Sequence, residues 1–435
     1  MAQASHCLRP LMICVGTRPE IIKIAPVCAA LRSRGVPFRL LHTGQHAELA
    51  EPIYHALDLE PDARLALARD GQTLAELSAA LLQKIDPVLE AWRPSALLVH
   101  GDTTSATMAA LAGFYRDVPV GHVEAGLRSH VARDPFPEEL NRSLIGRIAR
   151  WNFAPTPAAV NNLREEGIPA ASVHLVGNTI VEATQQATER LRRRTTRHDP
   201  SLYDGAAALA QAGVPEASKP EQRVILVTAH RRENWGAPIA GLVRALAEIL
   251  VAHQDLAVIW LLHANPVLAS QVHAAHAQLP AREAARLHLR PALGYLEMIE
   301  HMNRAWLVLT DSGGLQEEAC ALGVPILVFR ETTERPEIIE AGAGRLVGTN
   351  PRRIVAEIDA LLGDSSKHRS MRLAGNPFGD GLASSRIASV LADWLARADR
   401  QAQPTAANRS EESPLPPRTR PPQLVWQASV QPGAL

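Results

Sequence analysis

The chain has 435 residues, 46% of them hydrophobic and 21% charged, which is typical of a globular enzyme and long enough for two domains. Lys and Arg together number 45, as do Asp and Glu, so no net positive field points to nucleic acid or to an anionic membrane. No segment has the ~20 apolar residues of a membrane helix or the apolar core of a secretion signal, so we expect a cytoplasmic protein without membrane insertion.

The first part of the chain alternates short apolar runs with helical patterns. The predicted strands are residues 11–15, 38–42, 96–100 and 118–124. A Gly-Thr-Arg turn follows the first strand, and Pro19 suits the first turn of the helix after it. Strands separated by helices predict a parallel sheet with right-handed crossovers.

The same alternation restarts in the second part of the chain. Its predicted strands are residues 224–228, 258–263, 307–310 and 325–329. Two doubly wound, Rossmann-like α/β domains in series are therefore predicted, facing a central cleft, because ligands of such sheets bind beyond the carboxyl ends of the strands. Residues 399–435 are rich in proline and are predicted to form a disordered tail.

Three carboxylates lie near predicted strand ends of the first domain. Asp102 follows one strand, Glu124 ends the next, and Glu138 opens the helix after that. Carboxylates gathered on one rim push each other's pKa values apart, so that one holds a proton while another is ionised. The pattern indicates paired general acid and base chemistry, with a helix cap for Asp102 and a helix-dipole partner for Glu138 as the structural alternatives.

The second domain offers an anion site at the strand-to-helix turn of residues 310–314, with the sequence TDSGG. Free N–H groups and the helix dipole attract a phosphate there, and the glycines permit its close approach. Glu318 lies one turn further and is placed to accept ribose hydroxyls. His230 and Arg335 follow neighbouring strands and add to the same rim. Together these residues favour a diphosphate ligand, with a plain strand-to-helix turn as the alternative.

The sequence predicts neither a cofactor nor a metal. No GxGxxG motif follows a predicted strand, and residues 342–344 have the wrong spacing and context for a nicotinamide site. The four cysteines, Cys7, Cys14, Cys28 and Cys320, form no metal-like spacing, and we expect them to be reduced and mostly buried.

Nine segments, in order and on predicted strand ends, resemble the bacterial non-hydrolysing UDP-N-acetylglucosamine 2-epimerase family. They are GTRPEIIKIAPV at 16–27, HTGQH at 42–46, GDTTSATMAAL at 101–111, VGHVEAGLRS at 120–129, PFPEELNR at 135–142, VGNTIVEA at 176–183, TAHRREN at 228–234, LTDSGGLQEEA at 309–319 and FRETTERPE at 329–337. They span nearly all of residues 11–390.

The resemblance implies a fold of the glycosyltransferase-B type and a homodimer without metal or nicotinamide. The first domain would comprise residues 1–178, completed by a final helix near 378–398 that crosses back to it. Residues 179–377 would form the UDP-binding domain.

The resemblance also assigns roles to individual residues. Asp102, Glu124, Glu138 and His230 fall on catalytic positions. The residues expected to bind the UDP-sugar are Arg18, Lys23, His263, Leu293, Met298, Ser312, Gly313, Gly314, Glu318 and Arg335. Among these, Glu318 would hold the ribose, while Leu293 and Met298 would contact uracil through the main chain.

Some positions depart from the family pattern. Gln45 and His46 are candidates for binding a second, activating UDP-GlcNAc, but Ala47 and Gly71 stand where regulated relatives carry arginine. Ala229 replaces the usual glycine before His230, beside a predicted phosphate contact.

The reaction implied is reversible epimerisation at carbon 2 of UDP-GlcNAc to give UDP-ManNAc. The hydrogen on carbon 2 becomes acidic only as UDP leaves carbon 1, so elimination to 2-acetamidoglucal would precede reprotonation and re-addition. Alternatives of the same fold are a 2-epimerase of a UDP-2,3-diacetamido-hexuronate, a hydrolysing 2-epimerase and a glycosyltransferase. A catalytically inactive UDP-sugar sensor would keep the second-domain site but not the carboxylates.

Overall fold

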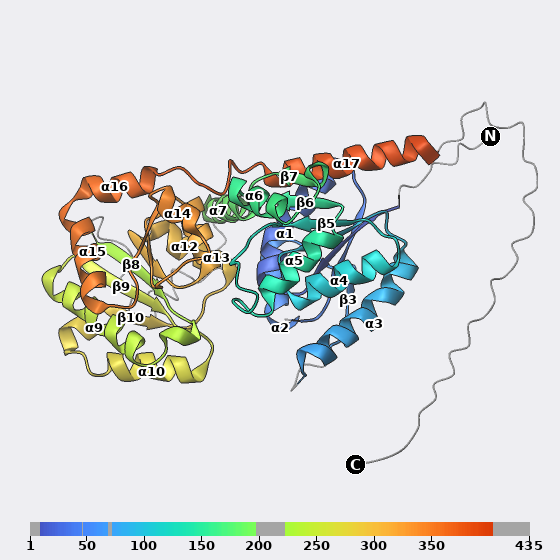
Figure 1. Ribbon diagram of the computed structural model, residues 1–435. Coiled ribbons are helices and arrows are strands. Elements are labelled where there is room, and N and C mark those ends of the chain that lie inside the picture. The colour runs from blue at the N-terminus through green and yellow to red at the C-terminus, as the bar shows by residue number, and fades with distance from the viewer. Residues whose placement is uncertain (1–8, 46, 68–71, 197–221, 403–435) are drawn as a thin grey trace, which may run out of the picture.

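The computed structural model describes residues 9–45, 47–67, 72–196 and 222–402, which form two α/β domains lying side by side (Figure 1). Each domain is built on a parallel sheet covered by helices, which confirms the predicted fold class. Within these ranges no helix is long and apolar enough to span a membrane. The predicted tail from residue 403 onward, together with Cys7, His46 and Gly71, lies outside the described residues.

The sheet of the first domain has the strand order β3-β2-β1-β4-β5-β6-β7. Its strands are β1 (Leu11–Val15), β2 (Phe38–His42), β3 (Ala63–Arg64), β4 (Leu97–His100), β5 (Val120–Val123), β6 (Trp151–Ala154) and β7 (Val173–Leu175). Strands β1, β4 and β5 are buried along their whole length, as expected where helices cover both faces. The strand order changes direction between β1 and β4, which makes this the switch point of the sheet. Ligands of such sheets bind beyond the carboxyl ends of the strands at this point.

Six helices surround this sheet. They are α1 (Arg18–Ser33), α2 (Ala47–Leu57), α3 (Leu74–Trp92), α4 (Thr104–Tyr115), α5 (Glu138–Ile148) and α6 (Pro157–Glu165). The Glu20 carboxylate accepts the N–H groups of Gly16 and Thr17 and so caps α1. The Thr103 hydroxyl accepts the N–H of Ala106 and caps α4. Both helices therefore begin at the carboxyl edge of β1 and β4.

The second sheet repeats the arrangement, with the order β10-β9-β8-β11-β12-β13. Its strands are β8 (Arg223–Thr228), β9 (Leu256–Leu261), β10 (Leu287–Arg290), β11 (Leu307–Thr310), β12 (Ile326–Val328) and β13 (Gly344–Leu346). The strand predicted at 258–263 is β9, which ends at Leu261, so His263 lies in the loop beyond it. The switch point of this sheet lies between β8 and β11.

Helices also cover the sheet of the second domain (Figure 1). They are α9 (Ala237–Ala252), α10 (Pro266–His276), α11 (Ala281–Ala284), α12 (Tyr295–Arg304), α13 (Gly313–Ala321), α14 (Pro336–Glu340), α15 (Pro351–Gly363) and α16 (Ser365–Leu373). The short 3-10 helices η1 (Ala170–Ser172) and η2 (Arg232–Asn234) precede β7 and α9.

Two helices come directly after the segments in which the chain crosses from one domain to the other. Helix α7 (Ile180–Thr196) packs against α1 of the first domain and against α12 and α13 of the second. Helix α17 (Ala383–Ala402) packs along α1 (Figure 1). It continues beyond the predicted end near 398 because no Gly or Pro interrupts the helical sequence before Pro404.

The two passing segments touch each other. The Asn178 N–H donates to the Phe378 carbonyl oxygen at 2.7 Å. Gly177 and Gly379 both have positive φ, +96° and +115°, which glycine adopts without strain. A Cβ at Gly379 would lie 3.2 Å from the Gly177 Cα, so the two backbones meet there directly.

Candidate functional site

The switch points of the two sheets face each other across the domain boundary. The clearest contact is between Lys23 on α1 and Glu317 on α13, whose Nζ and Oε2 atoms lie 2.8 Å apart. Arg335, after β12, influences the ionisation of both Asp102 and Glu124 in the first domain. The structure therefore gathers the strand-end residues of both domains around one site.

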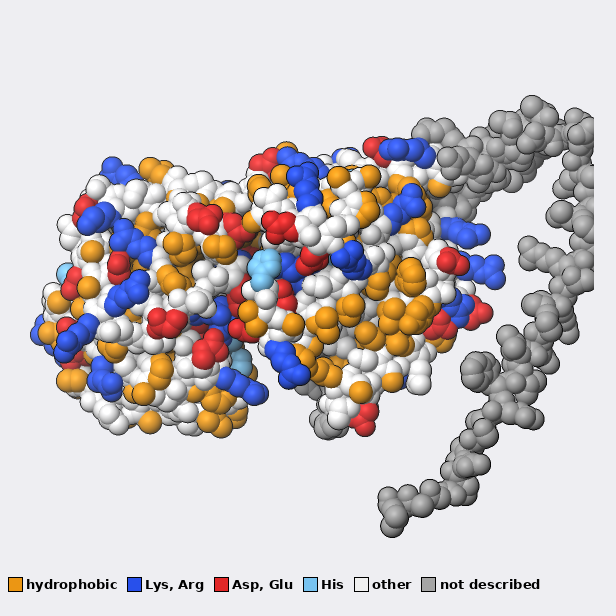
Figure 2. Space-filling model, viewed as in Figure 1, with side chains coloured by type: hydrophobic (Ala, Val, Ile, Leu, Met, Phe, Trp, Pro, Cys, Tyr) orange, Lys and Arg blue, Asp and Glu red, His pale blue; other side chains and the backbone are white. Residues whose placement is uncertain are grey.

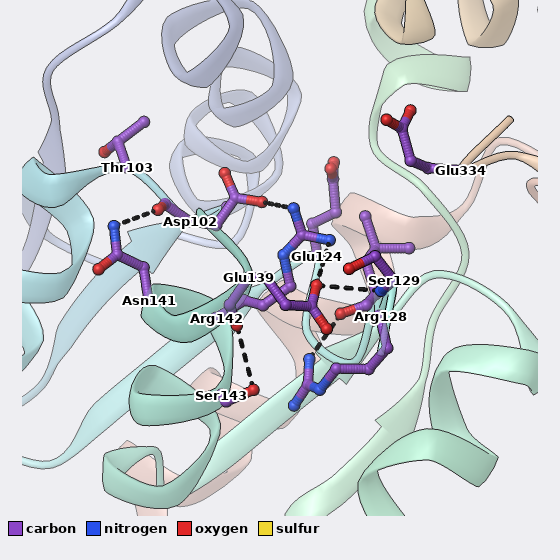
Figure 3. A network of polar contacts seen from close by, with 12 residues as sticks. Asp102, Thr103, Glu124, Arg128, Ser129, Glu139, Asn141, Arg142, Ser143 and Glu334 are labelled. Atoms are coloured by element: carbon purple, nitrogen blue, oxygen red, sulfur yellow. Dashed lines mark hydrogen bonds and ion pairs between the residues drawn. The ribbon is translucent and has the colours of Figure 1, made fainter. Parts of the chain in front are cut away.

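Asp102 follows β4 and pairs with an arginine that the sequence analysis did not single out. Arg142 Nη2 lies 2.6 Å from Asp102 Oδ2, and Arg142 Nη1 lies 3.3 Å from Glu139 Oε2 (Figure 3). Asn141 Nδ2 donates to the Asp102 carbonyl at 2.9 Å. Burial raises the pKa of Asp102, and the opposing effect of Arg142 does not cancel it. This carboxyl group therefore holds its proton to a higher pH than a free aspartic acid.

Glu124 follows β5 and meets the opposite environment. Its Oε2 lies 2.5 Å from Lys23 Nζ and 3.3 Å from His100 Nε2. Burial alone would raise the pKa of Glu124, but Lys23 and His100 outweigh it and hold that pKa well below its usual range. Its backbone has φ +67°, a left-handed conformation that costs a non-glycine residue about 1–2 kcal/mol. The fold thus holds an ionised carboxylate in an unfavourable backbone geometry.

The third predicted carboxylate is placed differently. Glu138 is the first residue of α5 and is partly exposed. Among the described residues its side chain has no ion pair or hydrogen bond. Its neighbour Glu139 is buried and accepts the N–H groups of Ser129 and His130, both at 3.0 Å (Figure 3). The structure links Asp102 and Glu124 electrostatically, whereas a catalytic role for Glu138 stays a prediction.

In the second domain, a buried aspartate orients His230. Asp311 Oδ1 lies 2.9 Å from His230 Nδ1, and its carboxylate also accepts backbone N–H groups of His230 and Arg231 and the Asn234 amide. Burial disfavours the ionised form of Asp311, but these partners outweigh it and lower the pKa. His230 is thereby fixed through Nδ1, which leaves Nε2 for a ligand.

His263 lies beside His230 in the second domain. The two rings stack with centroids 5.8 Å apart. Burial, followed by the proximity of His230, lowers the pKa of His263, so it is neutral at neutral pH. The pair forms a flat surface at the end of β8 and β9.

The predicted phosphate turn is the N-terminus of α13. Ser312 precedes the helix, and its N–H donates to Thr310 Oγ1 at 3.0 Å. A Cβ at Gly313 would lie 3.6 Å from Arg335 Nη2, so this turn and the guanidinium are adjacent. At Gly314 a Cβ would meet nothing within 4 Å. The start of α13 and the Arg335 guanidinium therefore lie side by side, and their binding of an anion stays a prediction.

Glu318 lies on the buried side of the same helix. Burial raises the pKa of Glu318 to about 7, and Arg18 at the start of α1 opposes that rise. The Met298 side chain is buried on α12, and Leu293, just before that helix, packs partly buried against the same core. The roles of these residues in holding ribose and uracil stay predictions.

The suggested activator site is described only in part. Gln45 Oε1 accepts a hydrogen bond from the Ser105 hydroxyl at 2.7 Å, and Ser105 also contacts Thr43 at 2.9 Å. His46 lies outside the described residues. In the part of the chain that is described, no group of three or more His, Cys, Asp or Glu residues is arranged to hold a metal.

Sequence reasoning missed four residues of the site, and each carried a local signal. They are His100, Arg142, Asp311 and Glu317. Arg142 lies three residues after Glu139 on one helix, a spacing typical of ion-pair partners, and the two side chains do pair. Glu317 and Glu318 are consecutive acids on an otherwise apolar helix, where burial without a partner would be costly.

Comparisons with known proteins agree with this geometry. Residues 29–392 match the model of the family described as UDP-N-acetylglucosamine 2-epimerase. The UDP-N-acetylglucosamine 2-epimerase of Salmonella typhimurium is 40% identical over 380 residues, covering 87% of this chain and 97% of the relative. The crystal structure of the Neisseria meningitidis UDP-GlcNAc 2-epimerase bound to UDP-GlcNAc is 34% identical with a TM-score of 0.78, covering 88% of this chain and 100% of that one. A Methanocaldococcus jannaschii structure in complex with UDP-GlcNAc and UDP is 33% identical with a TM-score of 0.70, covering 88% and 99%.

Proposed function

This chain belongs to the UDP-N-acetylglucosamine 2-epimerase family, and we propose that it interconverts UDP-GlcNAc and UDP-ManNAc through 2-acetamidoglucal. The observation that carries the proposal is the pair Asp102 and Glu124. Their pKa values are displaced in opposite directions within one site. One carboxyl group is thereby suited to give a proton and the other to take one.

The first step is loss of the diphosphate. In this proposal His230, Arg335 and the N-terminus of α13 stabilise the negative charge that develops on UDP, and the proximity of Arg335 to Gly313 supports their acting together. As the bond from carbon 1 to the phosphate oxygen breaks, the carbon 2 hydrogen becomes acidic. Glu124 removes that proton, and the electron pair of the broken carbon–hydrogen bond forms the double bond of the glycal.

The second step returns a proton to the other face of carbon 2. Asp102, whose pKa is raised by burial, supplies it, while UDP adds back to carbon 1. In the reverse reaction the two carboxyl groups exchange roles, as microscopic reversibility requires. The buried contact of Lys23 with Glu317 joins the domains beside Glu124 and limits access of water to the glycal.

Proton NMR of the protein with UDP-GlcNAc in deuterated water tests the proposal. We expect UDP-ManNAc to appear with deuterium at carbon 2 and without added cofactor. Free ManNAc together with UDP would identify the hydrolysing reaction instead. Turnover of a UDP-2,3-diacetamido-hexuronate with none of UDP-GlcNAc would replace the proposed substrate.

A homodimer and a cytoplasmic location are part of the same proposal. Exposed apolar side chains gather over α3, α4 and α5 on the first domain (Figure 2). They are Leu74, Phe114, Tyr115, Leu140 and Leu144. Such a patch on adjoining helices supports contact with a second copy of the chain. Buried, unpaired Cys14, Cys28 and Cys320 are compatible with a reducing compartment.

A further inference from the structure

Glu317 is a fully enclosed charged group of the site and joins the two domains. Its side chain is 1% exposed and lies in the second turn of α13. Oε2 lies 2.8 Å from Lys23 Nζ of the first domain, and Oε1 accepts a hydrogen bond from Arg335 Nε of the second. One carboxylate therefore holds two of the cations that the sequence analysis assigned to the diphosphate.

Lys23 is shared in turn between two carboxylates. Its Nζ lies 2.5 Å from Glu124 Oε2 as well as 2.8 Å from Glu317 Oε2. Burial opposes the charged form of Lys23, but Glu124 and Glu317 outweigh it and raise its pKa. The four groups alternate in sign along the line Glu124, Lys23, Glu317, Arg335, so their formal charges cancel.

This alternation affects how strongly the site attracts a diphosphate. Buried charges are weakly screened, so each cation left without a counter-charge adds substantially to the binding of an anion. The reaction requires UDP to leave carbon 1, to stay nearby and then to add back. A site that held free UDP too tightly would favour the glycal complex and slow re-addition, because binding energy in that state raises the next barrier.

We propose that Glu317 is a positioning residue that acts as an internal counter-anion at the diphosphate site. It fixes Lys23 and Arg335 across the domain boundary, and it offsets part of their charge so that UDP is held without being trapped. This inference rests on the proposed function, and it extends to Glu124, because the same Lys23 ammonium contacts both carboxylates. Glu317 does not touch the reacting atoms in this role.

The test compares two adjacent glutamates by calorimetry with UDP and with uridine. Glu317→Gln should bind UDP more tightly, on the order of tenfold, because one buried negative charge is lost. Its affinity for uridine, which has no phosphate, should be unchanged. Glu318→Gln should weaken the binding of both ligands, because Glu318 is assigned to the ribose. Glu357→Gln, which breaks a partly exposed ion pair with Arg345 in the same domain, is the control and should change neither.

Measurements of kcat and KM distinguish a positioning role of Glu317 from a merely structural one. Glu317→Gln should lower kcat for epimerisation by at least about tenfold while KM falls. Glu317→Asp keeps the charge but shortens the reach, so it should retain wild-type affinity for UDP and still lose kcat. The Asp variant also serves if Glu317→Gln does not fold, since unchanged kcat in Glu317→Asp would refute the positioning role.

Three results overturn the inference. The first is UDP binding that is unchanged or weaker in folded Glu317→Gln. The second is tighter uridine binding in that variant, which would indicate a general rearrangement. The third is a UDP affinity that changes as much in Glu317→Asp as in Glu317→Gln. Because Asp keeps the negative charge, loss of charge would then not explain the tighter binding of UDP. Failure of the wild-type protein to bind UDP would instead contradict the proposed function.

Discussion

Arg142 Nη2 lies 2.6 Å from Asp102 Oδ2, so a buried guanidinium on α5 meets the carboxyl group at the end of β4. The contact opposes the effect of burial on Asp102 without cancelling it. Arg142 thereby orients the Asp102 carboxyl group, which is assigned as the acid, and lowers its proton affinity. Glu124 instead contacts Lys23 and His100, which outweigh the effect of burial, so the pKa values of the two carboxyl groups shift in opposite directions.

Neutral replacements of the two carboxylates should stop the reaction but leave the UDP site intact. We expect Asp102→Asn and Glu124→Gln each to lower kcat by about a thousandfold, since each removes a proton-transfer group. UDP affinity should stay within about threefold in Asp102→Asn. It should rise in Glu124→Gln, because Lys23 then loses one of its two counter-charges. Activity is measured by NMR and UDP binding by calorimetry, with Asp86→Asn, from a surface ion pair with Arg116, as the control. Near-normal turnover in either site variant would refute the assignment.

Removal of the arginine should shift the pH dependence of the reaction. Arg142 lowers the pKa of Asp102, so in Arg142→Met that pKa rises further. In the pH profile of kcat/KM, the limb that reports ionisation of Asp102 in the free enzyme should therefore move to higher pH. Arg142→Lys, which keeps a positive charge, should move that limb less. The measurement is kcat/KM against pH for the wild type and both variants. A limb that moves to lower pH would mean that Asp102 is not the group observed.

Asp311 should matter for stability as well as for binding. Asp311→Asn loses an ionised acceptor facing three N–H donor residues, which we expect to cost about 3 kcal/mol in the free energy of unfolding. His230 loses its anchor, so UDP binding should weaken by about tenfold. Denaturant unfolding and calorimetry measure the two effects, and unchanged stability would contradict the described network.

The same aspartate should make stability depend on acid. Its folded-state pKa is lowered, so its contribution is fully present above the unfolded pKa of about 4 and is lost as the pH falls through the folded value. The difference in melting temperature between wild type and Asp311→Asn should therefore narrow below about pH 4. A difference that stays constant into acid would show that ionisation of Asp311 is not involved.

Glu318 should make ribose binding depend on pH near neutrality. Its pKa is raised to about 7, and the ionised carboxylate is the better acceptor for two hydroxyls. Uridine affinity should therefore fall as the pH drops below 7, by less than about tenfold per pH unit. Uridine is chosen because it has no phosphate that titrates in this range. In Glu318→Gln, which keeps His230 and His263, the affinity should be weaker and flat with pH.

The apolar patch over α3, α4 and α5 should control assembly. We expect the wild-type protein to sediment as a dimer and Leu144→Glu to sediment as a monomer, because a buried unpaired charge would oppose association. The matched control is Leu373→Glu on α16, since Leu373 is also exposed but lies on the other domain. Dimers that persist in Leu144→Glu and dissociate in Leu373→Glu would place the interface elsewhere.

Much of the fold could be predicted because its strands are buried on both faces. Such strands are continuous apolar runs, as in β1 and β4, and they stand out between helical patterns. The two-residue β3 and the three-residue β7 and β13 lack enough residues to show any period, so they were not predicted. The four-residue β6 and β10 were not predicted either, because Asn152 and His288 interrupt their apolar runs. Most shifted strand boundaries moved by one or two residues, as at His263, which lies two residues beyond the end of β9.

The site was predictable where it depends on strand ends and not where it depends on domain packing. Asp102 and His230 follow buried strands, and parallel strands bring their carboxyl ends to one edge. The contact of Lys23 with Glu317 joins residues of different domains, so it depends on how α7 packs against both. No local pattern encodes that packing, and the sequence therefore suggested phosphate binding for Lys23 but not its two carboxylate partners.

Helix α17 comes last in the chain, yet its buried side chains Ile387, Leu391 and Leu395 complete the apolar core beneath α1. During synthesis on the ribosome, the first domain is made first and lacks this covering helix until the second domain has emerged. A fragment cut after residue 178 would leave the surface of α1 exposed, whereas a circular permutant that joins α17 directly to β1 would supply it at once. The first domain is thus translated first, but its apolar core is completed last.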